Sequence, residues 1–282
     1  MLSSGIPTIA EYQGLESEPK YRDLLEHSRL FEDNCQTGNV SARIYGRKWV
    51  QDPFLQWSRR WEYVYTAQRV LAWATTRPTP ANLVDAGSGF TFFPFYLMQC
   101  NPGLNIDCYD NDPLVGEALR AVEKVRGFAP GFRREDLEAL RQDDESVDAV
   151  YSVSVIEHTR HPEQVINEVF RVLKPGGLFV CTFDVSFESR SPMHWSRVAA
   201  LVEHVTGMFE ISSDWTDIDF TGLESNPGIV TTAWTAATGA AALPWRHPLL
   251  VWFYDLVRGR PRGRLYRPMT FCCGAFTKPT AG

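Results

Sequence analysis

Short apolar runs alternate with helical patterns between residues 81 and 185, and this alternation restricts the fold more than any other feature of the chain. Residues 162–173 carry apolar side chains at helical spacing, and Lys174-Pro-Gly-Gly177 ends that helix before the next apolar run. Strands that alternate with helices form a parallel sheet with right-handed crossovers. The sequence therefore predicts an α/β fold. The predicted strands span residues 82–85, 105–110, 147–154 and 178–183.

The chain divides into three zones. Residues 1–80 are rich in aromatic side chains and favour helices, and Arg77-Pro-Thr-Pro80 marks their boundary. Residues 81–190 hold the alternating pattern of the sheet, and residues 191–282 follow it. In this last zone the predicted elements are a helix at 193–209 and a strand at 268–277 that closes the edge of the sheet.

The composition argues against several classes of function. A net charge of −6 is unfavourable for nucleic-acid binding, which needs a basic face. The uncharged stretch 225–245 is rich in Thr, Gly and Pro, so we predict no membrane span there, although it can form an oligomer contact or a substrate lid. The six cysteines show no CxxC spacing and no cluster with histidine. We expect reduced thiols, no metal site and, because residues 1–7 lack the features of a signal peptide, a cytoplasmic protein.

The first strand runs into the glycine turn Asp85-Ala-Gly87-Ser88-Gly89. Glycines let the backbone approach a ligand closely, and the helix that follows offers free N–H groups. A tight strand-to-helix turn explains this segment equally simply, and many nucleotide-binding proteins share it. Asp110 ends the next strand, 21 positions after Gly89, where a carboxylate can accept both ribose hydroxyls of an adenosine group or can be a solvated turn residue.

A bulky residue distinguishes between two nucleotide ligands. Dinucleotide-binding loops need a third glycine, which packs helix on strand and leaves room for pyrophosphate. This chain has Phe92 in that region, which argues against a dinucleotide. S-adenosylmethionine (SAM) has no pyrophosphate and does not need that space.

Several segments, in the correct order, resemble the class I SAM-dependent methyltransferases with small-molecule substrates. The resemblance covers residues 82–184 and departs from the family at Thr91, where another glycine is usual, and at Arg141, where proline is usual. The matching segments are Leu83-Val-Asp-Ala-Gly-Ser-Gly89, Asp110, Asp136-Leu-Glu-Ala-Leu140 with Ser146-Val-Asp-Ala-Val150, Ser152-Val-Ser-Val-Ile-Glu157-His158, and Glu168-Val-Phe-Arg-Val-Leu-Lys-Pro-Gly-Gly177.

The resemblance implies a Rossmann-like three-layer sandwich with a mostly parallel seven-stranded sheet and a helical N-terminal cap. It also implies SAM as the cofactor. Gly87, Ser88 and Gly89 would lie against its methionine part, with Ser152 nearby. Asp85 would orient the loop or hold the amino group of SAM through water. Asp110 would hold the ribose. Asp136 and the Leu137 backbone would contact the adenine.

Methyl transfer needs alignment, and it needs a base only when the acceptor arrives protonated. Histidine suits this role near neutral pH, and His158 and His194, after the fourth and fifth strands, are the candidates. His158 has a structural interpretation as well, because Glu157-His158 occurs in this family whatever the substrate. The aromatic residues of the first zone can cover the active site or simply pack onto the core. They are Trp57, Trp61, Tyr63 and Tyr65.

The segment Arg258 to Arg267 carries five arginines in ten positions. It is either a solvated loop or a dock for an anionic partner, such as a phosphorylated or carboxylate substrate or an acidic carrier protein. A homodimer is left open. We predict a biosynthetic methyltransferase acting on O, N or C of a small molecule, in specialised metabolism or sugar modification. The alternatives are an enzyme that cyclises SAM or transfers its aminocarboxypropyl group, and a non-catalytic SAM-binding protein.

Overall fold

A computed structural model describes residues 1–37, 53–215, 217–244, 248–257 and 266–280. Within these ranges a sheet of seven strands forms the centre of the molecule, in the order β3-β2-β1-β4-β5-β7-β6. The strands are β1 Ala81–Ala86, β2 Leu104–Asp110, β3 Gly131–Arg134, β4 Val147–Val153, β5 Leu173–Ser186, β6 Glu210–Ile211 and β7 Met269–Thr277. The helices are α1 Ile9–Gly14, α2 Pro19–Thr37, α3 Arg59–Ala74, α4 Phe93–Cys100, α5 Pro113–Arg126, α6 Pro162–Val172, α7 Trp195–Met208, α8 Thr232–Thr238 and α9 Pro248–Val257.

The sheet is mostly parallel, as the sequence predicts. Strands β1 to β5 pair in parallel, whereas β7 is antiparallel to both β5 and β6. The predicted strand at 268–277 is therefore present, but it does not close the sheet, because β6 lies outside it. The expected fold class is confirmed.

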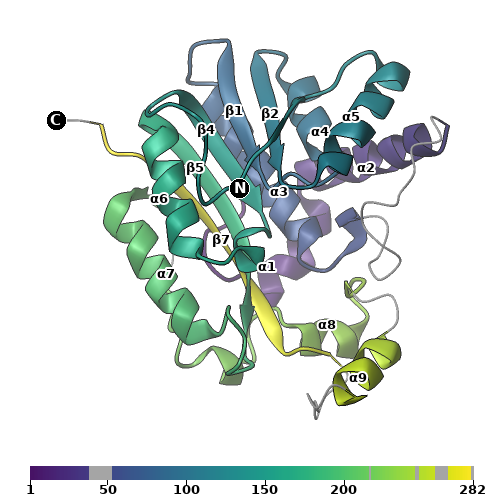
Figure 1. The fold of residues 1–282 in the computed structure, drawn as a ribbon. Helices are drawn as coiled ribbons and strands as arrows, with labels where there is room; N and C mark the ends of the chain where they lie inside the picture. The colour runs from purple at the N-terminus through teal and green to yellow at the C-terminus, as the bar shows by residue number, and fades with distance from the viewer. Residues whose placement is uncertain (38–52, 216, 245–247, 258–265, 281–282) are drawn as a thin grey trace.

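Helices cover both faces of the sheet and make three layers (Figure 1). Helices α2, α3, α4 and α5 pack on one face, and α6 and α7 pack on the other. The strands alternate between these layers. In β7, Phe271 and Cys273 join the core on the α3 side, whereas Cys272 and Phe276 join the core on the α7 side. Each face thereby buries its own apolar cluster.

The N-terminal zone is part of this sandwich. Helix α3 lies directly against β4 and β5, and its Trp61 and Tyr65 are fully buried. Gly5 and Cys273 exchange two backbone hydrogen bonds of 2.7 and 2.9 Å, so the first residues run beside β7. The predicted boundary near residue 80 coincides with the start of β1. The division of the chain into three functional units stays a prediction.

Two further sequence predictions concern cysteines and membranes. All six cysteines are free thiols, and five of them are buried. Among the described residues, no helix combines the length and apolar character that a membrane crossing requires.

Candidate active site

A cavity of about 1010 Å³ opens at the carboxyl ends of the parallel strands. Ligand pockets of about 300 to 1,000 Å³ are typical, so this cavity has room for more than one small molecule. In open α/β sheets ligands bind at this edge, where neighbouring strands lead to opposite faces. The lining comes from the segments after β1, β2, β3, β4 and β5, from residues 56–63 and from residues 267–269.

The glycine turn after β1 has no space for a side chain at Gly87. Its φ of +76° is rarely adopted by other residues, and an added Cβ would lie 2.2 Å from Cγ1 of Val155. The amides of Gly87 and Ser88 both donate to the Tyr109 carbonyl, at 2.8 and 3.1 Å, which fixes the turn against β2. The backbone of this turn therefore forms part of the cavity wall, with no side chain at Gly87.

Asp110 is fixed by the same turn. Its Oδ2 accepts from the Gly89 amide at 2.9 Å, and its Oδ1 accepts from the Asp112 amide at 2.9 Å. Each carboxylate oxygen can accept a second hydrogen bond, so the side chain remains able to receive hydroxyl donors. Asp110 and the glycine turn, predicted separately, thus form one hydrogen-bonded unit.

Asp85 lies beneath this unit at the end of β1. Burial raises the pKa of its carboxyl group to about 8, the Tyr151 hydroxyl beside it lowers the pKa, and the charge of Asp110 raises it. Within the described residues, no arginine or lysine contributes to the pKa of Asp85. Burial therefore favours the neutral, protonated form of Asp85 in the ligand-free protein.

This raised pKa predicts a pH dependence of stability. Between about pH 4 and pH 8 the folded protein keeps a proton on Asp85 that the unfolded chain has released, so the free energy of unfolding falls as the pH rises through that window. The melting temperature of the ligand-free protein should fall between about pH 5 and pH 8, and Asp85→Asn should make that fall smaller. Differential scanning calorimetry measures these melting temperatures. If the melting temperature of the variant falls with pH as much as that of the wild type, the raised pKa does not belong to Asp85.

The segment predicted to contact adenine also lines the cavity. Asp136 is exposed and its Oδ1 accepts from the Glu138 amide at 3.0 Å, whereas Leu137 is buried. Glu138 in turn accepts from the amides of Arg160 and His161, at 2.7 and 3.1 Å. The segment after β3 is thereby joined to the segment after β4.

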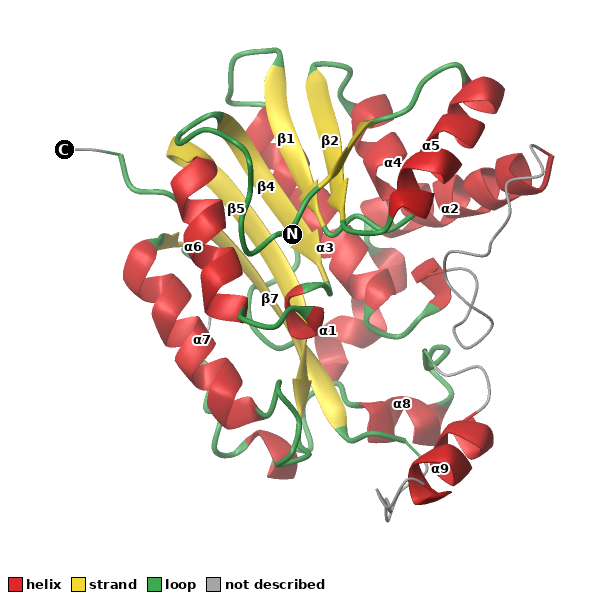
Figure 2. Cartoon of the chain, in the orientation of Figure 1, coloured by secondary structure: helices red, strands yellow, loops and turns green. Residues whose placement is uncertain are grey.

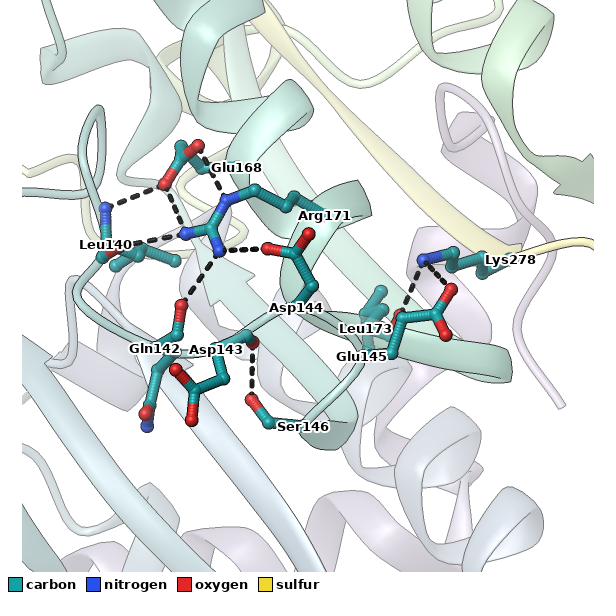
Figure 3. A network of polar contacts seen from close by, with 10 residues as sticks. All are labelled: Leu140, Gln142, Asp143, Asp144, Glu145, Ser146, Glu168, Arg171, Leu173 and Lys278. Atoms are coloured by element: carbon teal, nitrogen blue, oxygen red, sulfur yellow. Dashed lines mark hydrogen bonds and ion pairs between the residues drawn. The ribbon is translucent and has the colours of Figure 1, made fainter.

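Two side chains of α6 hold the loop that follows (Figure 3). Glu168 accepts from the Leu140 amide at 2.8 Å. Arg171 pairs with Glu168 at 2.8 Å and donates to the carbonyls of Leu140 and Gln142, at 2.9 and 2.8 Å. The Glu168–Gly177 motif of the sequence therefore positions the predicted adenine segment from outside the cavity.

The three remaining predicted residues lie in different places. His158 lines the cavity, where desolvation lowers its pKa and the Asp184 carboxylate opposes that effect. Ser152 is buried behind the glycine turn, and its hydroxyl donates to the Ala86 carbonyl at 3.0 Å. His194 is absent from the lining and caps α7, with its Nδ1 2.9 Å from the Ser196 hydroxyl. The structure thus brings His158, but not Ser152 or His194, to the cavity wall. Among the aromatic candidates, Trp57 and Tyr63 line the cavity.

A cluster of charged residues in and behind the cavity wall is not foreseen by the sequence analysis. Glu62 of α3 is fully buried, and it accepts from Arg59 Nη1 at 2.6 Å and from the Ser154 hydroxyl at 2.7 Å. Asp184, near the end of β5, lines the cavity close to Arg59. Burial raises the pKa of Asp184 and of its neighbour Glu157, while the positive charge of Arg59 lowers both.

Two sequence signals could have revealed this cluster. Glu62 is the one acid of this helix and stands between Trp61 and Tyr63, so a buried position would require a partner for its charge. Asp184 follows a predicted strand, as Asp85 and Asp110 do, and acids in that position gather at one edge of a parallel sheet.

Comparison with known proteins identifies the family. The family profile described as a methyltransferase domain matches residues 84–181. Sarcosine/dimethylglycine N-methyltransferase of Aphanothece halophytica is 29% identical over 42% of this chain and 43% of its own length. Malonyl-(acyl-carrier protein) O-methyltransferase of Methylococcus capsulatus is 33% identical over 43% of this chain and 44% of its own length. Residues 84–181 are therefore assigned to a methyltransferase domain of the class I SAM-dependent superfamily.

The matches to these two curated methyltransferases span less than half of their length. Solved structures show the fold of the methyltransferase superfamily over a larger part of the chain. The cyclase SpnF has a TM-score of 0.52 at 19% identity, over 88% of this chain and 94% of its own. Geranyl diphosphate C-methyltransferase of Streptomyces coelicolor has a TM-score of 0.50 at 14% identity, over 76% of this chain and 79% of its own.

The residues that line this cavity fit SAM, the cofactor of this domain family. Gly87 has no Cβ, and an added one would fill the space beside its backbone. Asp110, next to this turn, can still accept hydrogen bonds from ribose hydroxyls. Phe92 is 2% exposed and packs edge-on against Tyr63, so the third glycine of a dinucleotide loop is replaced by a core residue. The cavity therefore suits an adenosine ligand without a pyrophosphate.

Proposed function

We propose that this protein transfers the methyl group of SAM to an O, N or C atom of a small molecule, in specialised metabolism or sugar modification. The observation that carries this proposal is that one cavity has two kinds of lining. Gly87, Asp110 and Asp136, which suit the cofactor, line it. Arg59 and Met269, from the two terminal zones of the chain, line the same cavity.

The individual roles follow from these positions. The Gly87–Gly89 turn binds the methionine part, Asp110 the ribose, and Asp136 with the Leu137 backbone the adenine. Ser152 and Asp85 position the turn from behind. Residues 56–63 and 267–269 shape the acceptor site, which gives the N-terminal and C-terminal zones their function.

When bound, SAM supplies a methyl carbon that is already activated by its sulfonium. The chain's own contribution is to hold an acceptor at that carbon, to exclude water and to accept a proton where the acceptor carries one. His158 is the base we propose, because desolvation lowers its pKa and leaves the imidazole neutral near pH 7. His194 lies outside the lining and is the weaker candidate.

Ligand-dependent melting tests the cofactor assignment. A ligand that binds only the folded protein raises the melting temperature by mass action. SAM and S-adenosylhomocysteine should raise it, and NAD should not. Stabilisation by NAD alone would overturn the assignment.

Product analysis tests the reaction. The protein is incubated with SAM and a desalted small-molecule extract of cells, and the adenosine products are separated by mass spectrometry. S-Adenosylhomocysteine in excess of a no-protein control supports methyl transfer. Methylthioadenosine instead indicates aminocarboxypropyl transfer or cyclisation of SAM, and unchanged SAM supports a binding protein without catalysis.

Asp110 should contribute strongly to cofactor affinity. Asp110→Ala removes the acceptor of two backbone amides and of the ribose, and hydrogen bonds to a charged group contribute roughly 1.5–3 kcal/mol each. Titration calorimetry should show S-adenosylhomocysteine binding weakened by about 10- to 100-fold. Asp107→Ala, in the same strand, removes only an outward ion pair with Arg133 and should leave the affinity unchanged. Equal affinities of the two variants would argue against the ribose role.

A further inference from the structure

Three carboxyl groups share one guanidinium at the wall of the cavity. Glu62, Glu157 and Asp184 all act electrostatically on Arg59, whose side chain lines the cavity and is 20% exposed. Arg59 begins α3, and α3 packs against β4 and β5, the two strands that bring Glu157 and Asp184 to this place (Figure 2). With every group ionised, the three acids would outnumber the one base. The cluster is therefore short of positive charge.

The hydrogen bonds of the cluster show where this charge is missing. Glu62 accepts from Arg59 and from Ser154, so both of its oxygens have partners. Oε1 of Glu157 accepts from the Asp184 amide at 3.4 Å, whereas its Oε2 is buried and has no hydrogen-bond partner among the described residues. Asp184 lines the cavity, and within the described parts of the chain no group donates a hydrogen bond to its carboxylate. The missing charge belongs at Glu157 and Asp184.

A proton balances these two groups when no cation is beside them. Burial and neighbouring carboxylates raise the pKa of Asp184 to about 8 and that of Glu157 to about 7, although Arg59 lowers both. His158 does not supply the charge, because desolvation lowers its pKa. Two neighbouring carboxyl groups in a desolvated site do not both ionise readily. A cation bound beside Asp184 would take the place of that proton.

The other arginines of the lining are engaged or exposed. Arg141 forms an ion pair of 3.1 Å, and Arg134 donates to a backbone carbonyl at 3.1 Å. Arg160 and Arg267 are exposed, so water and salt screen their charges. Arg267 is the described member of the predicted anion dock, whose other four arginines lie outside the described residues. The described arginines therefore leave the deficit at Asp184 in place.

The neutral side chains next to the cluster suit an organic cation. Trp57 and Tyr63, which flank Arg59 and Glu62 in the chain, line the same cavity and are 1 and 4% exposed. Aromatic rings attract ammonium groups, and a wall that excludes water strengthens the attraction between opposite charges. A desolvated carboxylate with aromatic neighbours is suited to bind an ammonium group rather than a phosphate or a carboxylate.

We propose that the acceptor is an amine that enters the cavity as an ammonium cation and is bound by Asp184. This inference rests on the proposed function, because it names the class of small molecule that receives the methyl group. Glu157 is a positioning residue, since its carboxyl group accepts from the Asp184 amide. Binding of the ammonium group requires no methyl transfer, so it can be measured by itself.

Three probes of similar shape and different charge test the proposal. Near neutral pH benzylamine is a cation, benzyl alcohol is neutral and benzoate is an anion. Each is titrated calorimetrically into the protein saturated with S-adenosylhomocysteine. Benzylamine should bind at least about tenfold more tightly than benzyl alcohol, because a hydrogen bond between two charged groups is stronger than one to a neutral hydroxyl. Absence of benzylamine binding, or equally tight binding of benzyl alcohol or benzoate, would overturn the proposal.

Asp184→Asn removes the charge with almost no change in shape. Its affinity for benzylamine should fall by at least about tenfold, while its affinity for S-adenosylhomocysteine stays that of the wild type. Asp143→Asn is the matched control, because Asp143 is exposed and lies outside the lining, and it should bind benzylamine like the wild type. Circular dichroism reports the folding of both variants. Equal benzylamine affinities of the two variants would contradict the role of Asp184.

The sulfonium of SAM is the other cation that Asp184 can serve. If Asp184→Asn weakens SAM binding by tenfold or more and leaves the binding of S-adenosylhomocysteine and benzylamine unchanged, the carboxylate serves the cofactor and the proposal is overturned. Turnover separates this inference from methyl transfer. S-Adenosylhomocysteine formed from SAM and the extract, without benzylamine binding, overturns the amine acceptor alone. Benzylamine binding without such turnover supports the cation site and contradicts methyl transfer.

Discussion

Replacing Gly87 by alanine should weaken the binding of SAM and S-adenosylhomocysteine by about 30-fold or more. The added Cβ would lie 2.2 Å from Val155 Cγ1, and the φ of +76° strains any side chain. Left-handed backbone costs roughly 1–2 kcal/mol for a residue with a Cβ, and overpacking typically costs about 1–3 kcal/mol more. Because about 1.4 kcal/mol corresponds to tenfold in affinity, a combined strain of roughly 2–5 kcal/mol corresponds to a loss of about 30-fold to about 3,000-fold.

A second glycine separates the two sources of strain. Gly127 ends α5 with a φ of +79°, almost the same as that of Gly87, but an added Cβ there meets no atom within 4 Å. Gly127→Ala should therefore lower stability by roughly 1–2 kcal/mol without affecting cofactor affinity. Val155→Ala removes the two closest clashing atoms from Gly87→Ala and leaves a contact of 2.9 Å, so the double variant should recover part of the affinity. Calorimetric titration with S-adenosylhomocysteine measures all four proteins, and wild-type affinity of Gly87→Ala would contradict the close approach.

The positions of strands β1, β2, β4 and β5 along the chain could be predicted because each is an apolar run ended by polar or turn residues. Two strands escaped prediction for a physical reason. In β3 all four residues are at least partly accessible, and both residues of β6 are exposed. Such edge strands are held by pairing with a neighbour and carry no apolar periodicity of their own. The place of β7 depends on β6, so a strand that looks terminal in the sequence lies inside the sheet.

Site residues directly at strand ends were easier to place than those in longer connections. The glycine turn, Asp110 and His158 follow β1, β2 and β4 by a few positions at most, so the sheet brings them to one edge. His194 is separated from β5 by a loop that turns back, because Ser186 and His194 form a backbone bridge. The sequence distance from the strand therefore says little about the position of His194.

The charged cluster illustrates a different difficulty. Arg59 and Glu62 belong to the N-terminal zone, whereas Ser154 and Asp184 come from β4 and β5. Their association depends on α3 packing on the sheet, which is a tertiary contact between segments far apart in the chain. Local pattern can indicate that Glu62 needs a partner, but it cannot select Ser154 as that partner.

Replacing Glu62 by alanine should lower the free energy of unfolding by about 3–5 kcal/mol, because it leaves a partly buried guanidinium without its carboxylate. Glu62 is completely buried, and the pKa of Arg59 is raised by its charge. Its other partner, Ser154, has a φ of +50°, and the Ser154 amide donates to the Thr182 carbonyl at 2.9 Å. Residues with a side chain keep such a backbone conformation only where their surroundings impose it. Loss of Glu62 therefore also releases a strained residue of the cavity wall.

A double-mutant cycle distinguishes the unpaired charge from simple loss of packing. Arg59→Met/Glu62→Met removes both charges with little change in volume, and it should be more stable than Glu62→Met alone, since an isolated buried charge costs more than an apolar replacement of the pair. Glu16→Ala is the control: Glu16 is 68% exposed and pairs with Arg60 at 3.2 Å, so its loss should cost at most about 1 kcal/mol. Urea denaturation measures each variant. If Glu62→Ala loses no more stability than Glu16→Ala, the buried ion pair does not hold α3 to the sheet, and the wall of the acceptor end must be held by the apolar contacts of Trp61 and Tyr65 instead.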